Sequence, residues 1–322
     1  FQGMQVSAEK IVVLGTGGTI AGKAKAAGDN VGYVAGQVGV HDLLDAVPGL
    51  TDAARGPLQV EQVAQLDSKD MAFAVWATLA ARCHQLLTDP AVRAIVITHG
   101  TDTLEETAWF LHSVLDAHKP VVLTCAMRPA TALTPDGPQN LLDAVAVVLA
   151  PGATGVVAVA AGELHAARNV QKVHPYRVHA FNSGDAGPLG WVEEGRVRLV
   201  QNWPLPPVGR SFAAIKTGIE STEWPWVEVV LSHAGARAQT VDALVHAGVR
   251  GLVVACTGNG TIHHALEAAL LRAQQAGVRV MRATRCAEGQ VLPKPGDVLP
   301  DSQGLSPVKA RVALLLDLLQ AH

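Results

Sequence analysis

Residues 10–19, KIVVLGTGGT, place a short apolar run directly before a glycine-rich turn. Lys10 to Leu14 has the β-branched, apolar composition of a buried strand, and Gly15-Thr16-Gly17-Gly18-Thr19 follows with no spacer. The same order returns at residues 94–102, AIVITHGTD, and at residues 251–260, GLVVACTGNG. We therefore expect three buried strands that each end in a polar loop containing glycine.

Helical patterns separate the apolar runs. Thr103 to Leu115 is the clearest, because apolar residues recur at helical intervals and Thr103 and Glu106 have the spacing of a capping box. Asn140 to Leu149 and Ile262 to Gln275 show the same periodicity. Three more apolar runs predict strands, namely Val121 to Cys125, Gly155 to Ala160 and Val278 to Met281. Alternating strands and amphipathic helices predict an α/β fold, with mostly parallel sheets flanked by helices.

A chain of 322 residues is longer than one hydrophobic core usually organises. The prolines within Trp203-Pro204-Leu205-Pro206-Pro207 interrupt any continuing helix or central strand, which favours a domain boundary there. We predict a larger N-terminal catalytic domain over residues 4–205, a linker over 206–216 and a smaller C-terminal domain over 217–322. Residues 1–3, Phe-Gln-Gly, resemble the remnant of a cleaved tag and are left out of the fold prediction.

Composition and charge exclude several classes of partner. The formal net charge is -3 and no lysine or arginine block is present, so the sequence carries no electrostatic footprint for nucleic acid or an anionic membrane. The longest apolar runs, such as Ala144 to Ala150 and Val156 to Ala161, are too short to span a bilayer. The four cysteines are widely spaced, which predicts reduced thiols rather than a zinc site or a disulfide framework. A small, nearly neutral substrate fits this chain best, with no nucleic acid and no membrane as partner.

The turn after the first strand invites a comparison with nucleotide-binding loops. Residues 14–23, LGTGGTIAGK, have glycine and lysine at P-loop spacing, but Ala24 lacks the side-chain oxygen that holds magnesium. The dinucleotide fingerprint fails as well, since its third glycine falls on Ile20. What remains is a turn that lets backbone amides approach a ligand beside the Thr19 hydroxyl. A nucleotide- or phosphate-binding protein built on Gly15–Lys23, and a plain strand-to-helix turn, both stay open as alternatives.

A second polar cluster follows the apolar run at residues 94–98. Gly100 in THGTDTLEET, residues 98–107, permits a sharp exit from the strand, and Thr101 and Asp102 then lie near the amino end of the next helix. Helix capping explains one such residue but not the whole polar run. A threonine hydroxyl is a weak nucleophile that needs a neighbouring base, and acyl transfer needs backbone N–H donors, which glycine-rich turns supply. Because ligands bind beyond the carboxyl ends of parallel strands, we expect these segments to form one site.

Residues 16–22, TGGTIAG, and 99–108, HGTDTLEETA, resemble the two signature motifs of the bacterial-type L-asparaginases. A third stretch, from Lys119 to Leu141, resembles the same family, and the likeness extends from about Lys10 to the C-terminus. The resemblance implies an amidohydrolase that converts L-asparagine to L-aspartate and ammonia without a cofactor or a metal, with minor L-glutaminase activity. It also implies a homotetramer, built as a dimer of dimers with active sites shared between subunits.

The same resemblance implies roles for the catalytic residues. Thr19 is implied as the nucleophile that forms a covalent acyl enzyme, with Tyr33 as its hydrogen-bonded partner. Tyr33 lies within Ala21 to Gly39, a long stretch rich in glycine and alanine, which we expect to be a mobile lid. The lysine of a second catalytic set must lose its proton, and desolvation favours that loss. The implied second set is Thr101, Asp102 and Lys172.

The resemblance also implies contacts with the substrate. The substrate-binding residues that it implies are Gly18, Ser68, Lys69, Gly100, Ala126 and Asn259. Ser68 and Asp102 are expected to hold the α-carboxylate and α-amino groups, since an acceptor-only carboxylate suits an ammonium. Asn259 is implied as a contribution from a neighbouring subunit. Lys69 departs from the uncharged or acidic residue expected there, and a cation weakens ammonium binding unless it points away or meets the α-carboxylate.

Several residues depart from the family pattern or have a structural interpretation. His99 ends a strand and is expected to make structural hydrogen bonds rather than to act as a general base, and His263 and His264 predict no metal site. The family's cross-subunit acid has no convincing match, and Glu288 is a weak candidate. The cysteine pair of a periplasmic relative has no counterpart, which favours the cytoplasm, although a trimmed signal peptide leaves the periplasm open. A non-catalytic amino-acid-binding relative of the same fold is a third alternative.

Overall fold

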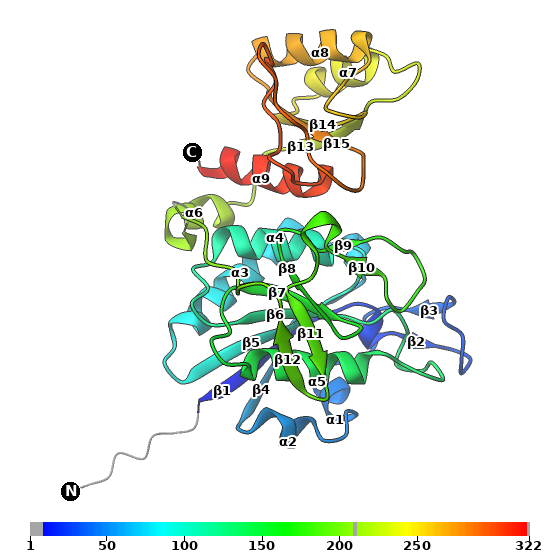
Figure 1. Ribbon diagram of the computed structural model, residues 1–322, viewed down its shortest axis with the longest axis vertical. Helices are drawn as coiled ribbons and strands as arrows, with labels where there is room; N and C mark the ends of the chain where they lie inside the picture. The colour runs from blue at the N-terminus through cyan, green and yellow to red at the C-terminus, as the bar shows by residue number, and fades with distance from the viewer. Residues whose placement is uncertain (1–8, 209–210, 321–322) are drawn as a thin grey trace, which may run out of the picture. The chain divides into compact units, whose positions relative to one another are not determined.

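The computed structural model describes residues 9–208 and 211–320, and its contacts divide the chain into two compact units, Phe1–Phe212 and Ala213–His322. Each unit has helices on both faces of a sheet (Figure 1), which confirms the predicted α/β fold class with a smaller C-terminal part. The tag remnant expected at residues 1–3 lies outside the described residues. The predicted limits of the domains and of the linker stay predictions.

The first unit is built on an eight-stranded sheet in the order β12-β11-β8-β7-β6-β5-β1-β4. Its strands are β1 Lys10–Gly17, β4 Leu58–Leu66, β5 Val92–Thr98, β6 Val121–Thr124, β7 Val156–Ala160, β8 Glu163–Ala166, β11 Gly190–Glu193 and β12 Arg196–Leu199. The pairs from β4 to β7 are parallel, whereas β8, β11 and β12 are joined by antiparallel pairs. Two separate ribbons pair β2 Lys23–Ala24 with β3 Tyr33–Val34, and β9 Gln171–Lys172 with β10 Phe181–Asn182.

Helices cover both faces of the eight-stranded sheet (Figure 1). Their limits are α1 Val40–Asp45, α2 Leu50–Ala54, α3 Phe73–Thr88, α4 Leu104–Val114 and α5 Gly137–Leu149. Residues of α1, α2 and α5 share one core with the side chains of Ile11 and Val13. Val12 and Leu14 alternate with these on β1 and are fully buried as well, toward the face that α3 and α4 cover. Burial on both faces explains why this strand is a continuous apolar run.

The second unit is built on a parallel three-stranded sheet in the order β13-β14-β15. Its elements are α6 Phe212–Glu220, whose first residue still belongs to the first unit, β13 Val227–Leu231, α7 Gln239–His246, β14 Gly251–Cys256, α8 His264–Gln275, β15 Arg279–Thr284 and α9 Pro307–Gln320. α7 and α8 pack on one face and α9 on the other (Figure 1). α8 begins later than predicted because His263 caps it, accepting a hydrogen bond from the backbone N–H of Ala265 at 3.2 Å.

Helix α4 confirms the predicted helix but not the predicted capping box. Thr103 is the residue before the helix, yet its side chain makes no capping hydrogen bond. Its hydroxyl donates instead to the backbone carbonyl of Ser68 at 2.9 Å. The capping bond predicted for the Thr103 hydroxyl was therefore wrong, because a carbonyl from a distant loop takes the hydroxyl in place of the local amide. This bond ties the start of α4 to the loop that follows β4.

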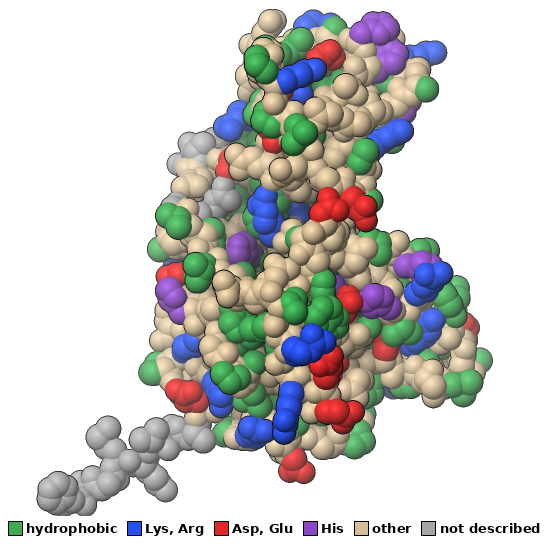
Figure 2. Space-filling view, in the orientation of Figure 1, with side chains coloured by type: hydrophobic (Ala, Val, Ile, Leu, Met, Phe, Trp, Pro, Cys, Tyr) green, Lys and Arg blue, Asp and Glu red, His purple; other side chains and the backbone are tan. Residues whose placement is uncertain are grey.

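The charged surface side chains and the cysteines agree with what the composition predicted. Figure 2 shows acidic and basic side chains interspersed on the visible surface of the first unit, as a net charge of -3 suggests. Within the described part of the chain, no helix is both long and apolar enough to cross a membrane.

All four cysteines are free thiols, as predicted. Burial raises the pKa of the Cys83 thiol to about 12 and that of Cys256 to about 11, so neither is a ready nucleophile at neutral pH.

The centre of the large sheet sets the stability of the first unit. Leu123 on β6 is 0% exposed, so Leu123→Ala is expected to lower the free energy of unfolding by about 2–5 kcal/mol through lost burial and a residual cavity. Urea unfolding followed by circular dichroism measures this change. Leu205→Ala is the matched control, since Leu205 is 77% exposed, and equal losses in the two variants would contradict the assignment of the core.

Candidate active site

Three strands bring three polar turns together at one edge of the sheet. β4, β1 and β5 are neighbours and parallel, so the segments that follow them leave from the same edge. The backbone N–H of Gly18, after β1, donates to the carbonyl of Leu66 at 2.9 Å. A side chain on Gly18 would collide with the backbone of Gly100, and one on Gly100 would collide with Ser68. The Ser68 hydroxyl also accepts a hydrogen bond from the Asp102 backbone N–H at 3.2 Å. The turns therefore touch, and only glycine allows it.

The Thr19 hydroxyl lies under the ribbon formed by β2 and β3. Thr19 is 6% exposed, and its Oγ1 lies 2.6 Å from the phenolic oxygen of Tyr33 on β3. The base of the ribbon is fixed by the backbone N–H of Gly36, which donates to the carbonyl of Gly18 at 3.0 Å. Gly22 leaves room for the tyrosine ring, since a Cβ there would lie 2.9 Å from Tyr33 Cδ2. The predicted pair of Thr19 and Tyr33 is thus brought together by the structure.

Lys172 lies against the start of α4. Its Nζ donates to Thr101 Oγ1 at 2.8 Å and to Asp102 Oδ1 at 2.6 Å. The Lys172 side chain is 17% exposed, whereas that of Asp102 is 50% exposed and open to an incoming ligand. The backbone N–H of Lys172 donates to Glu105 Oε2 at 3.1 Å. Sequence reasoning missed Glu105, although it stands three residues after Asp102 in the motif, about one helical turn further along α4.

The Ala126 turn, after β6, is held by residues at the start of α5. Ala126 is fully buried. The Asp136 carboxylate accepts hydrogen bonds from the backbone N–H groups of Met127 and Arg128, both at 2.9 Å. Asn140 donates to the carbonyl of the residue before Ala126 at 2.8 Å. Asp136 and Asn140 were not predicted as site residues. Asp136 stands directly before the helix-starting Gly-Pro pair, but its carboxylate makes no cap hydrogen bond to α5 and binds the amides of the Ala126 turn instead, so helix-capping signals could not have found this role.

His99 is a structural hydrogen-bonding residue in this geometry. Its Nδ1 lies 2.7 Å from the Gly100 carbonyl oxygen, and its Nε2 lies 2.8 Å from Thr107 Oγ1. Trp76 Nε1 donates to the same hydroxyl at 2.9 Å. Complete burial lowers the pKa of His99 to about 4, so the ring is neutral at pH 7. A neutral ring donates through Nδ1 and accepts through Nε2, which fixes the Gly100 carbonyl rather than moving a proton.

Family models match both units of the chain. The model described as Asparaginase, N-terminal, matches residues 10–205, and the model described as Glutaminase/Asparaginase C-terminal domain matches residues 226–322. The chain belongs to the asparaginase/glutaminase family. The resemblance carried by the two signature motifs is thereby confirmed.

Relatives in the asparaginase/glutaminase family align with nearly the whole chain. L-asparaginase 2 of Escherichia coli (strain K12) is 37% identical over 99% of this chain and 92% of that protein. The glutaminase-asparaginase of Pseudomonas fluorescens biotype A is 34% identical over 96% of this chain and 86% of that protein. A solved structure described as probable cytoplasmic L-asparaginase from Campylobacter jejuni matches with a TM-score of 0.89 and 36% identity, over 96% of this chain and 95% of that chain. The chain is an enzyme of this family.

Two predicted substrate-binding residues of this asparaginase-family site make other contacts in the structure. The Lys69 ammonium is paired with Asp70 at 2.9 Å and Asp67 at 3.5 Å and is 61% exposed, so its charge is balanced within its own turn. Asn259 lies in the second unit, where its amide donates to the Leu292 carbonyl at 3.1 Å and accepts from the Leu292 N–H at 2.6 Å. The role of Asn259 across a subunit boundary stays a prediction.

The nucleotide-binding alternative does not fit the turn after β1. Thr19 opens a single 3-10 turn, Thr19–Ala21, and the chain then enters β2 instead of the long helix whose amino end holds a phosphate in such proteins. Across the described residues, no group of three or more His, Cys, Asp or Glu side chains is placed to hold a metal ion.

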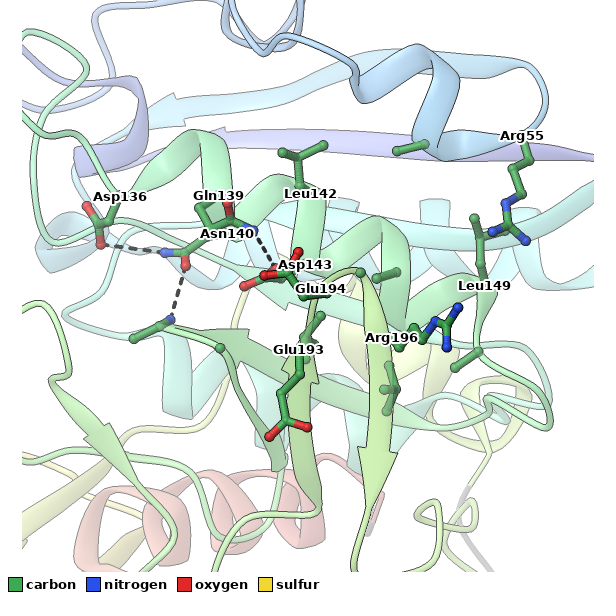
Figure 3. A pocket seen from close by; sticks show the side chains of 18 of the residues that line it. Arg55, Asp136, Gln139, Asn140, Leu142, Asp143, Leu149, Glu193, Glu194 and Arg196 are labelled. Carbon is green, nitrogen blue, oxygen red and sulfur yellow. Dashed lines mark hydrogen bonds between the residues drawn. The ribbon is translucent and has the colours of Figure 1, made fainter.

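A groove of about 1240 Å³ lies behind the Ala126 turn rather than at the predicted catalytic residues. Figure 3 shows α5 residues on one side of it and the β11–β12 hairpin on the other. The labelled side chains from these two elements include Asp136, Asn140, Asp143, Glu193, Glu194 and Arg196. Burial raises the pKa of Asp143, whose carboxylate accepts a hydrogen bond from Gln139 at 2.8 Å. The groove shares only the supporting residues Asp136 and Asn140 with the site.

The contact between Gly18 and Gly100 gives a stability prediction. Gly18→Ala places a Cβ against the Gly100 backbone at a φ of 84° and a ψ of -172°, a region open essentially to glycine, so backbone strain of about 1–3 kcal/mol is joined by overpacking of about 1–3 kcal/mol. Gly195→Ala is the control for strain alone, since its φ is 72° and nothing lies within 4 Å of an added Cβ. Urea unfolding compares the two variants. Equal destabilisation would show that the turns do not touch as described.

Burial of His99 predicts acid sensitivity. The folded-state pKa of about 4 lies below the ordinary value of 6.5, so the unfolded state binds the proton more tightly. This contribution to stability is complete above pH 6.5 and is lost as the pH falls toward 4, with a slope of at most about 1.4 kcal/mol per pH unit. His99→Gln, which does not titrate, is expected to flatten that slope in urea unfolding between pH 7 and 4.5. An unchanged slope would place the acid sensitivity elsewhere.

Proposed function

We propose that this chain hydrolyses L-asparagine to L-aspartate and ammonia through a threonine-bound acyl intermediate, with minor activity on L-glutamine. The observation that supports the proposal is the pair of hydroxyl groups on touching turns, each with its own partner. Thr19 meets Tyr33 at 2.6 Å, and Thr101 meets Lys172 at 2.8 Å. Two activated hydroxyls suit a reaction in two halves, one that forms an acyl enzyme and one that hydrolyses it.

In the first half, Thr19 Oγ attacks the side-chain amide carbon of asparagine. The carbonyl π bond opens to an oxyanion, for which backbone N–H groups of the glycine-containing turns are the proposed donors. The hydroxyl proton leaves along the hydrogen bond to Tyr33, and the collapse of the tetrahedral intermediate breaks the carbon–nitrogen bond. The nitrogen takes up the proton that left Thr19, relayed by the Tyr33 phenol, and departs as ammonia, leaving a β-aspartyl ester on Thr19.

In the second half, water attacks the ester carbon. The proton that the water loses is taken up by the set of Thr101, Lys172 and Asp102. A protonated lysine is a donor only, and in that form its ammonium donates to both Thr101 and Asp102. After loss of one proton the amine keeps a lone pair that accepts from the Thr101 hydroxyl, while an N–H still donates to Asp102. The ester bond breaks, Thr19 recovers its hydroxyl proton, and aspartate is released.

Substrate binding is proposed to use the exposed side of Asp102. One carboxylate oxygen is taken by Lys172, and the half-exposed side chain leaves the other for the α-ammonium group of asparagine. Ser68 lies beside it through the bond to the Asp102 backbone and is the proposed partner of the α-carboxylate. The balanced charge of Lys69 removes the conflict with the α-ammonium that the sequence suggested.

The proposed oligomeric state and cellular compartment are taken from the resemblance to the family. We propose a homotetramer, a dimer of dimers in which Asn259 completes the site of a neighbouring subunit, and a cytoplasmic location. The cytoplasm is supported by the description of the Campylobacter jejuni structure, while a relative from Haemophilus influenzae is described as periplasmic. Light scattering on the purified chain measures the mass of the assembly, and a monomer with full activity would contradict shared sites.

Ammonia release from L-asparagine tests the proposed reaction. Thr19→Ala is expected to lower kcat by about a thousandfold or more without unfolding the chain, since it removes the attacking atom. Thr78→Ala, an exposed threonine on α3, is the matched control and should turn over normally. Normal turnover in Thr19→Ala would refute the nucleophile. Tight binding of aspartate by the wild-type chain without any ammonia release would favour a non-catalytic relative.

A further inference from the structure

A polar cluster outside the proposed catalytic residues joins β8 to the ribbon that carries Lys172. It consists of Glu163 and His165 on β8, with His179 and Ser183 on either side of β10. His179 Nε2 lies 2.9 Å from Glu163 Oε2, and His165 Nδ1 lies 2.8 Å from Ser183 Oγ. His165 Nε2 lies 3.6 Å from the same Glu163 oxygen, beyond hydrogen-bonding distance, so the two contacts are neighbours on β8. We call these four residues the β8 clamp.

The β8 side of the clamp is rigid. Glu163 and His165 are two positions apart on a strand, so their side chains leave the same face of the sheet. β8 is itself held between β7 and β11 by antiparallel pairing. The His165 side chain is 1% exposed and that of Glu163 is 21% exposed. Shielding from water strengthens the contact between His165 and Ser183, whereas the His179 side chain is 58% exposed, so its contact with Glu163 is partly solvated.

The other side of the clamp holds both ends of β10. His179 stands two residues before β10, and Ser183 follows it directly. β10 pairs with β9 through Phe181, which lies opposite Lys172. The two strands form a sheet of their own, and a two-stranded ribbon is marginal in water without support. Attachment to β8 at both ends adds to the support that burial of Ala180 and Phe181 gives to β10.

We infer that the β8 clamp is a positioning device for Lys172. It fixes β10, β10 fixes the backbone of Lys172, and Glu105 fixes the same backbone from the α4 side. The lysine ammonium is thereby kept at 2.8 Å from Thr101 and 2.6 Å from Asp102. The contacts of the clamp described above join β8 to both ends of β10 and do not involve Thr101 or Asp102, so its effect on turnover is expected to pass through the lysine. The inference rests on the catalytic role proposed for Lys172.

Kinetics on L-asparagine test whether the clamp acts through Lys172. Glu163→Ala and Ser183→Ala each open one end of the clamp and are expected to lower kcat about tenfold, since small displacements of a catalytic group cost this much or more. In a Lys172→Met background, Glu163→Ala should cause no further loss, because the group that it positions is gone. Glu163→Gln keeps an acceptor for His179 and should recover most of kcat.

A matched control and a structural readout complete the test. Glu193→Ala removes an exposed carboxylate on the neighbouring strand β11, paired only at the surface with Arg198, and should leave kcat unchanged. Crystal structures of Glu163→Ala and Ser183→Ala should show the Lys172 ammonium beyond hydrogen-bonding distance of Thr101. If Glu163→Ala does not fold, Ser183→Ala carries the test.

Three outcomes separate this inference from the proposed function. Wild-type kcat in the clamp variants, with kcat lost in Lys172→Met, overturns the inference alone. Equal losses from Glu163→Ala with and without Lys172 also overturn it, since they indicate a general structural role. Wild-type kcat in Lys172→Met refutes the proposed role of the lysine, while a displaced ammonium in the Glu163→Ala crystal still supports the clamp.

Discussion

The site depends on the contact between the backbones of Gly18 and Gly100. Both residues stand directly before a threonine, so the contact brings the turns that carry Thr19 and Thr101 against each other. Parallel pairing of β1 with β5 carries the two turns to the same edge, and the absence of two Cβ atoms lets them close. Tyr33 and Lys172 then reach the two hydroxyls from separate ribbons. Without the contact, the two hydroxyls would belong to two unrelated loops.

The charged side chains around these turns contribute more to the geometry and charge balance of the site than to the stability of the fold. The pair of Lys172 and Asp102 is shielded on the lysine side and open on the carboxylate side, so solvent weakens its contribution to folding. In the proposed function its value lies in orientation, because one carboxylate oxygen is held by Lys172 while the Asp102 side chain stays half-exposed. The exposed pairs of Lys69 with Asp67 and Asp70 contribute little energy but cancel a charge that would repel an ammonium.

Sequence patterns predicted the strands and turns, which depend on residues adjacent in the chain. They missed the contacts that depend on residues distant in the chain. The strands and their glycine-containing turns were predictable, because apolar runs stop abruptly at residues such as Gly100. The capping box at Thr103 was wrong, since the hydroxyl finds a carbonyl across the site. Lys172 came only from family resemblance, because β9 is too short for any periodicity and exists through pairing with Phe181. Asp136 was missed because its amide partners are identified only after folding.

Tyr33 covers Thr19, and in the proposed reaction this limits which amides reach the hydroxyl. A freely accessible hydroxyl that hydrolyses side-chain amides would also react with asparagine residues in other proteins. Here Thr19 is 6% exposed beneath a ribbon, and its neighbours are the proposed partners of a free ammonium and a free carboxylate. An asparagine inside a polypeptide has neither group and brings bulky flanking residues. In the proposed reaction, the enclosure thus restricts the chemistry to free amino acids and excludes asparagine residues within polypeptides.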